Sequence, residues 1–244
     1  MILEVQELTK NYGGVSAVRD LSFSVKEHEK LGVIGPNGAG KTTLFNLICG
    51  SSIADRGRIL FKGKNILKQH SPYKACLQGI GRTFQVVKPL PNLTVLDNFV
   101  VAACAKSKKM HQAIQDAKEM LRFVGLDAHG EILAKDLPIG NLKRLELGRS
   151  LLTRPELLLL DECMGGLNPK ESDGVIELIE EMSRSGITII IIEHIMPAIM
   201  SISDRIIVLD YGQKIADDTP ERVAQNPKVI KAYLGEEYVH VKAR

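Results

Sequence analysis

The segment Gly35–Thr43 constrains this chain more than any other part of the sequence. It reads Gly-Pro-Asn-Gly-Ala-Gly-Lys-Thr-Thr, and it joins the apolar run Lys30–Ile34 to the segment Lys41–Cys49. The run has the pattern of a buried strand, and the following segment that of a helix that ends before Gly50. Glycines at these spacings let backbone N–H groups point inward at an anion beside the helix N-terminus. The order strand, G-x-x-x-x-G-K-T, helix therefore predicts a loop that binds the phosphates of a nucleotide.

Each polar group of this loop has an expected partner on ATP. Lys41 is expected to reach the β- and γ-phosphates, Thr42 to ligate Mg²⁺ and Thr43 to meet the α-phosphate. The other expected nucleotide contacts of the loop are Gly35, Asn37, Gly38, Ala39 and Gly40. GTP is disfavoured because the chain has no N-K-x-D sequence, the pattern that reads guanine.

Two acids follow the apolar run Leu157–Leu160, at the point where a buried strand is expected to end. At the carboxyl edge of a parallel sheet such acids face the ligand crevice. Asp161 is expected to hold Mg²⁺, directly or through water. Because side chains alternate along a strand, Glu162 is expected to point elsewhere and to act as general base on the attacking water.

A second buried strand, Ile187–Ile192, leads to Glu193 and His194. If it ends at the same edge, His194 is expected to contact the γ-phosphate or the catalytic water. Gln85 follows Arg82-Thr83-Phe84, and without further context it reads as a surface residue.

Apolar strands separated by helices predict an α/β fold with a mainly parallel sheet covered on both faces. The first third reads as short strands, and the middle reads as helical. Thr94 and Asp97 resemble a capping box that opens a helix through Ala105. A second helix is expected over 111–124, with the apolar face Ile114, Ala117, Met120, Leu121 and Val124, and a third over 142–152. Asn168-Pro169 predicts the start of a helix with its apolar face at Val175, Ile176, Leu178, Ile179 and Met182.

The composition is that of an ordinary globular protein. The chain has 244 residues, 44% of them hydrophobic and 25% charged, and its formal net charge is +3. That charge is too small to indicate nucleic-acid binding, and none is expected. No run approaches the ~20 apolar residues of a membrane-spanning helix. There is no signal-peptide pattern, and the four cysteines lack metal-ligand spacing, so a cytoplasmic location is expected.

Taken in this order and spacing, the phosphate loop, Gln85, Leu157–Glu162 and His194 resemble an ABC-transporter nucleotide-binding subunit. The resemblance covers essentially the whole chain. It implies one domain over 1–244: a P-loop NTPase core of the RecA-like type, an N-terminal antiparallel β subdomain and an inserted helical subdomain at roughly 90–155. By this resemblance Gln85 senses Mg²⁺ and the membrane subunit, Tyr12 stacks on adenine, and His194 is the switch histidine.

The resemblance also implies an ATPase that works in pairs. Two copies, or this chain and a paralogue, are expected to enclose two ATP molecules head to tail, with Gly166–Pro169 crossing the interface. ATP hydrolysis, with Mg²⁺ as cofactor, is expected to drive transmembrane permease subunits that contact the region of Gln85 and Val86–Leu96. The subunit is then expected to be cytoplasmic and peripheral on the inner face of the cell membrane.

Finer features resemble the ATPases of branched-chain amino-acid importers, to which ATPases for urea and short amides are related. They are Gly81–Gln85, Leu93–Asn98, Ile192–His194, Asn226–Ile230 and Tyr233–Gly235. The ending Tyr233–Glu237 also resembles the lipopolysaccharide-export ATPase, which ranks second because Arg82–Gln85 fits the importers better. A soluble ABC ATPase of DNA repair or translation is disfavoured because there is one P-loop and no long heptad array. A small-molecule kinase is disfavoured by His194 and the Gly140 loop.

One segment departs from the family pattern. Where the family usually reads Leu-Ser-Gly-Gly-Gln, this chain reads Leu-Pro-Ile-Gly-Asn over residues Leu137–Asn141. In the family this signature loop starts a helix that caps the γ-phosphate of the opposite subunit, so Gly140 and Asn141 are expected nucleotide contacts. Pro138 offers neither hydroxyl nor N–H, although proline is well tolerated at the first helical position. Either turnover is weakened by ~10–100-fold, or the backbone contacts that remain suffice.

Overall fold

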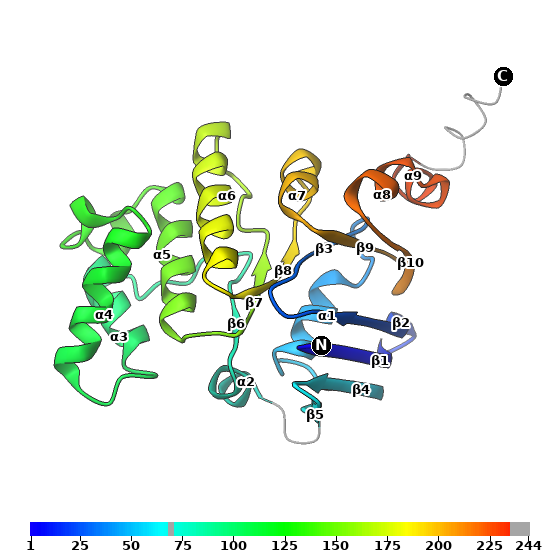
Figure 1. Ribbon diagram of the computed structural model, residues 1–244, viewed down its shortest axis with the longest axis horizontal. Coiled ribbons are helices and arrows are strands. Elements are labelled where there is room, and N and C mark those ends of the chain that lie inside the picture. The colour runs from blue at the N-terminus through cyan, green and yellow to red at the C-terminus, as the bar shows by residue number, and fades with distance from the viewer. Residues whose placement is uncertain (68–70, 235–244) are drawn as a thin grey trace. The chain divides into compact units, whose positions relative to one another are not determined.

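The computed structural model describes residues 1–67 and 71–234, which divide into two compact units (Figure 1). The described residues of the first unit are 1–67, 71–75 and 188–234, and the second unit comprises Cys76–Ile187. The part of the predicted C-terminal motif from Gly235 to Glu237 lies outside the described residues. The inserted helical subdomain at roughly 90–155 stays a prediction.

The first unit begins with an antiparallel sheet. Its strands are β1 (Leu3–Tyr12), β2 (Val15–Val25), β4 (Arg56–Phe61) and β5 (Lys64–Asn65), in the order β2-β1-β4-β5. Side chains alternate between buried and accessible along β1 and β2, as expected for strands that cover a core with one face. The predicted N-terminal antiparallel β structure is confirmed.

A parallel set of strands completes the first unit. Strand β3 (Lys30–Ile34) pairs in parallel with β8 (Thr188–Ile192) and with β9 (Arg205–Asp210), and β10 (Gln213–Asp218) adds an antiparallel edge. β8 is buried along its whole length, which explains its unbroken run of Thr and Ile. The helices of this unit are α1 (Lys41–Ile48), α7 (Met196–Ile202), α8 (Pro220–Gln225) and α9 (Pro227–Leu234).

The second unit combines two parallel strands with four longer helices (Figure 1). Strand β6 (Ile80–Arg82) pairs with β7 (Leu157–Asp161), and helix α2 (Pro72–Gln78) leads into β6. The helices are α3 (Val95–Ala103), α4 (Met110–Phe123), α5 (Ile139–Leu152) and α6 (Pro169–Arg184). Short 3-10 turns at Asp127–His129 and Ala134–Asp136 connect α4 to α5.

Most predicted elements of this unit are confirmed, with two corrections. Thr94 caps α3 by accepting a hydrogen bond from the Asp97 N–H, but α3 ends at Ala103 rather than Ala105.

Ile114 was expected on the buried face of α4, yet it is exposed, and the buried residues are Ala113, Ala117 and Leu121. These three residues recur every four positions, so they form one stripe that shifts by about 40° around the helix at each step, and Ile114 lies at the margin of this stripe. At α6 a full capping box joins Asn168 and Glu171.

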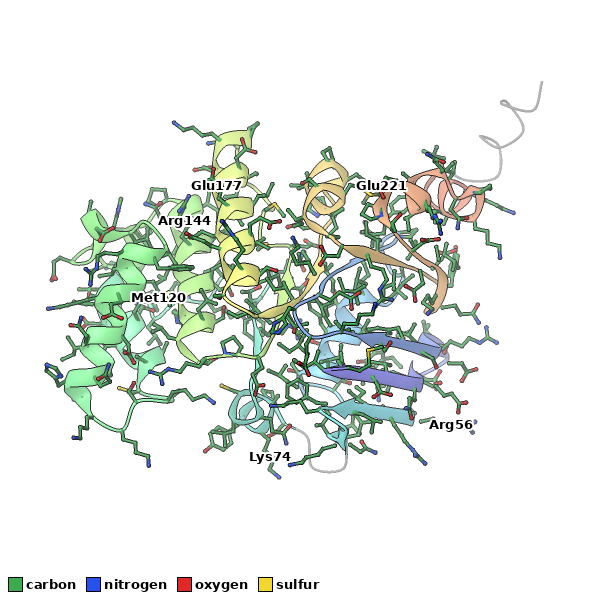
Figure 2. All side chains as sticks on the ribbon, viewed as in Figure 1. Arg56, Lys74, Met120, Arg144, Glu177 and Glu221 are labelled. Atoms are coloured by element: carbon green, nitrogen blue, oxygen red, sulfur yellow. The ribbon has the colours of Figure 1, made fainter. Side chains whose placement is uncertain are left out.

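Phe99 lies at the centre of the helical core of the second unit. Its side chain is fully buried in a cluster with residues of α4 and α5 and the turns between them. Gly148 of α5 makes room for it, since a Cβ at that position would stand 2.7 Å from the Phe99 ring. Met120, labelled on the ribbon in Figure 2, packs against the same cluster.

We expect Phe99→Ala to lower the free energy of unfolding by about 3–5 kcal/mol, because it removes a fully buried ring and leaves a cavity. Chemical denaturation followed by circular dichroism measures this loss. Phe123→Ala is the matched control, since Phe123 ends α4 with an exposed side chain. Equal losses for the two variants would contradict the assignment of Phe99 to the core.

Candidate functional site

The phosphate-binding loop links β3 to α1 through glycines in left-handed conformations. Gly35 has φ 153°, Gly38 φ 81° and Gly40 φ 101°. A Cβ on Gly35 would collide with the backbone oxygen of Leu209, and a Cβ on Gly40 with that of Ala17. Both positions therefore require glycine for conformation and for space.

The Lys41 ammonium folds back over this loop. Its Nζ donates hydrogen bonds to the carbonyl oxygens of Gly35 at 2.7 Å and Pro36 at 3.0 Å. Gly40 is the N-cap of α1 and provides no side-chain acceptor for the first N–H groups of the helix. A positive helix terminus, backbone donors and one ammonium group are thus gathered in one loop, which is the arrangement that binds phosphate.

Helix α9 lies beside the same loop. Lys228, Lys231 and Ala232 line a cavity of about 730 Å³ together with Pro36–Ala39. Burial raises the pKa of Tyr233, while a hydrogen bond with the Gly35 backbone acts in the opposite direction. Sequence reasoning missed both lysines as neighbours of the loop, because nothing local links positions so far apart in the chain.

Tyr12 ends β1 with half of its surface exposed, at 50%. Its hydroxyl lies 3.1 Å from the Ser52 Oγ, and the Lys10 ammonium lies 5.2 Å from the centre of its ring. An exposed aromatic ring is able to accept a planar base, but the adenine-stacking role of Tyr12 stays a prediction.

Asp161 is the last residue of β7 and is almost entirely buried, with 2% exposure. Arg82 Nη2 lies 2.8 Å from Asp161 Oδ2, and the Asp161 N–H donates to Thr83 Oγ1. The second carboxylate oxygen, Oδ1, is buried and has no hydrogen-bond partner among the described residues. A buried carboxylate oxygen without a donor is a suitable ligand for a hard cation.

Glu162 meets Gln85 directly, since Gln85 Nε2 donates to Glu162 Oε2 at 2.7 Å. The expectation that strand alternation sets the direction of Glu162 is wrong. Strand β7 ends at Asp161, and Glu162 has the left-handed φ of 48°, so the backbone turn itself redirects the side chain. Such a conformation costs a non-glycine residue about 1–3 kcal/mol and is typical of functional sites.

In the first unit, Glu193 follows β8 and is almost fully buried, whereas His194 is exposed. The His194 N–H donates to Glu193 Oε2 at 3.2 Å, and His194 Nδ1 lies 4.0 Å from the same oxygen. The exposed imidazole therefore stands beside a buried acid. Its predicted contact with the γ-phosphate stays a prediction.

The loop before α5 differs from expectation at Pro138. This residue is the N-cap of α5 and not its first helical residue, and its carbonyl oxygen accepts from the Leu142 N–H. A Cβ at Gly140 would lie 2.7 Å from Glu171 Oε1, so Gly140 packs against the start of α6. The Asn141 amide lies 3.1 Å from His129 Nε2. Both predicted nucleotide contacts thus have partners inside the second unit.

Comparison with known proteins identifies the relatives of this chain. The family model described as ABC transporter matches residues 18–165, and that of the branched-chain amino acid ATP-binding cassette transporter matches residues 213–239. The high-affinity branched-chain amino acid transport ATP-binding protein BraF of Pseudomonas aeruginosa is 40% identical, over 96% of this chain and 98% of its own. LivG of Escherichia coli K12, which carries the same description, is 38% identical over the same shares.

The fold is shared with solved ATP-binding cassettes. The ADP conformation of a cassette from an ABC transporter matches with a TM-score of 0.87 and 31% identity, over 96% of this chain and 99% of that one. Across residues 1–67 and 71–234, no helix has the length and apolar character needed to cross a membrane.

We expect Gly40→Ala to weaken ATP binding by about 10–100-fold, because the methyl group meets the Ala17 carbonyl and strains a left-handed residue. Titration calorimetry with ATP measures the affinity. Gly14→Ala is the control, since a Cβ there meets no atom within 4 Å. Unchanged affinity in Gly40→Ala would show that the loop tolerates a different backbone.

Proposed function

Because the chain belongs to the ATP-binding family of ABC transporters, whose members couple ATP hydrolysis to transport, we propose that it powers import of branched-chain amino acids or related amides. The similar proteins BraF and LivG are named for that cargo, and the second matching family model carries the same description. These relatives favour an importer over the lipopolysaccharide-export and soluble alternatives. The single observation that supports the catalytic role is the 2.7 Å hydrogen bond between Gln85 and Glu162.

ATP binding rests on the loop Gly35–Thr43. In the proposed complex the Lys41 ammonium, which contacts the Gly35 and Pro36 oxygens, turns to the β- and γ-phosphate oxygens of ATP. Backbone N–H groups of Asn37–Thr43 and the start of α1 surround the phosphates. Tyr12 stacks on the adenine base.

Hydrolysis requires a base for the attacking water, and Glu162 fits this role. Gln85 fixes one oxygen of its carboxylate by donating to Oε2. A carboxylate that is held in one direction takes a proton from water without first reorganising, which lowers the barrier. We assign to His194 the stabilisation of the γ-phosphate, since its ring is exposed directly after β8, beside the buried Glu193.

The residues present also fit a magnesium ion. The buried Asp161 Oδ1 has no donor among the described residues, and with Thr42 and Gln85 it would supply the protein ligands. No three His, Cys, Asp or Glu side chains gather as a metal cluster within residues 1–67 and 71–234. Mg²⁺ is usually bound through one or two carboxylates together with substrate phosphates, and Asp161 would provide such a carboxylate. When bound, the ion neutralises phosphate charge and orients the phosphates.

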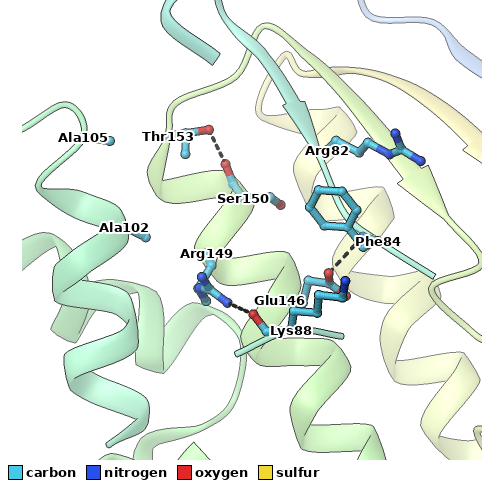
Figure 3. A pocket seen from close by; sticks show the side chains of 9 residues that line it. All are labelled: Arg82, Phe84, Lys88, Ala102, Ala105, Glu146, Arg149, Ser150 and Thr153. Carbon is cyan, nitrogen blue, oxygen red and sulfur yellow. Dashed lines mark hydrogen bonds between the residues drawn. The ribbon is translucent and has the colours of Figure 1, made fainter. Parts of the chain in front are cut away.

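The proposed partners are a second ATPase subunit, identical or paralogous, and transmembrane permease subunits, and the chain itself would lie in the cytoplasm, peripherally on the inner face of the cell membrane. Support for the permease contact comes from a cavity of about 420 Å³ in the second unit (Figure 3). Phe84 stands at its wall with 49% exposure, beside Lys88 and residues of α3 and α5. Gln85 follows Phe84 directly, so a helix docked here would move the residue that orients Glu162.

We expect Glu162→Gln to bind ATP normally but to lose about 10²–10⁴-fold in hydrolysis rate, because it removes the general base. Phosphate release and ATP affinity are measured on the purified chain, and uptake of labelled leucine on the assembled transporter. Glu177→Gln, an exposed position on α6 labelled in Figure 2, is the control. A Glu162→Gln rate within threefold of the unmutated chain would refute the assigned base.

We expect Pro138→Ser to change the hydrolysis rate by less than about twofold, because an N-cap residue uses its carbonyl and not its N–H within the helix. The added hydroxyl would also cap α5, so the melting temperature should rise. Steady-state phosphate release and a thermal melt decide the matter. A tenfold faster Pro138→Ser enzyme would show that proline weakens the loop.

A further inference from the structure

Helix α5 carries two charged side chains that are almost fully buried. Lys143 is 4% exposed and Glu146 is 8% exposed, and they lie one turn apart on the same face of the helix. Lysine and glutamate are seldom buried to this degree unless specific partners hold them. The proposed reaction does not yet use either of them.

Their partners are backbone atoms around the Gln85–Glu162 pair. Lys143 Nζ donates to the carbonyl oxygens of Gln85 at 3.3 Å and Glu162 at 3.0 Å. Glu146 Oε1 accepts from the Phe84 N–H at 2.9 Å, a bond drawn in Figure 3. One face of α5 is therefore hydrogen-bonded to two backbone segments. One contains Phe84 and the amide partner Gln85, and the other contains the proposed base Glu162.

We propose that Lys143 is a positioning residue that holds the Gln85 and Glu162 backbones in the geometry for hydrolysis. This inference rests on the proposed role of Glu162 as base. A single ammonium group bridges the two carbonyl oxygens, so it fixes the separation between the two segments whose side chains meet at 2.7 Å. Glu162 has a left-handed φ, and such a conformation persists only where its surroundings enforce it.

Glu146 complements this role. Burial raises the pKa of Glu146, whereas the Phe84 hydrogen bond and the charges of Lys143 and Arg149 lower it. The positive charge of Lys143 thus offsets the negative charge of Glu146. On the same helix face, Lys143 donates to backbone carbonyl oxygens and Glu146 accepts from a backbone N–H. Without the ammonium, two carbonyl oxygens would lose their common donor, and Glu162 would be free to relax.

The test compares Lys143→Gln, Lys143→Arg and the exposed-position control Lys118→Gln in the full-length chain. We expect Lys143→Gln to lower kcat by about 10–100-fold, because displacements of about 1 Å at a reacting group have this effect. Its KM for ATP should stay within about twofold, since ATP is bound by the loop Gly35–Thr43. Lys143→Arg should recover most of kcat, because a guanidinium also donates to two oxygens, and Lys118→Gln should leave kcat unchanged.

Activity is expressed per folded molecule, with folding followed by circular dichroism at a temperature below the melting transition of every variant. A normal kcat per folded Lys143→Gln molecule, beside an inactive Glu162→Gln, would overturn this inference and leave the proposed function intact. Normal kcat in both variants would refute the proposed base instead. A parallel loss in kcat and ATP affinity, not recovered by Lys143→Arg, would indicate a general structural role and would also overturn it.

Discussion

The parallel pairing of β6 with β7 brings together the proposed catalytic residues of the second unit, Gln85 and Glu162. Arg82 is aligned with Leu159, and the Thr83 N–H continues the ladder by donating to the Leu159 carbonyl. The chain then leaves both strands within a few residues, so Gln85 and Glu162 emerge close together although they are far apart in sequence. The Arg82–Asp161 ion pair, buried on both sides, fixes the two strand ends to each other.

The sequence was sufficient to predict features that depend only on residues close together in the chain. The glycine pattern of the phosphate loop determines its own conformation, because Gly35 and Gly40 have no alternative residue that fits. Asp161 was predictable as the end of an apolar strand. The helix N-caps at Thr94 and Asn168 and the parallel strands follow from the same kind of local pattern, and the resemblance to ABC-transporter subunits is now confirmed by comparison.

What the sequence could not supply is contact between distant segments. The direction of Glu162 depends on a left-handed turn that strand alternation does not foresee. Lys143 and Glu146 read as ordinary polar positions of a helix, and only the structure shows that their partners are the backbones of Phe84, Gln85 and Glu162. A helix that buries charged residues on one face and leucines on another has little amphipathic pattern to read.

Helix α5 connects the loop at Pro138 with the proposed catalytic residues Gln85 and Glu162. It begins at Pro138, in the loop expected to approach a second subunit, and one turn later it carries Lys143. A helix is stiff over so short a length, so a shift of its first turn is transmitted to Lys143 with little loss. Because Lys143 bonds to the Gln85 and Glu162 carbonyls, such a shift would alter the proposed base as well. A displacement of the loop at Pro138 would therefore bear on catalysis through the position of α5, whereas Pro138→Ser keeps the carbonyl that caps α5 and leaves the helix in place.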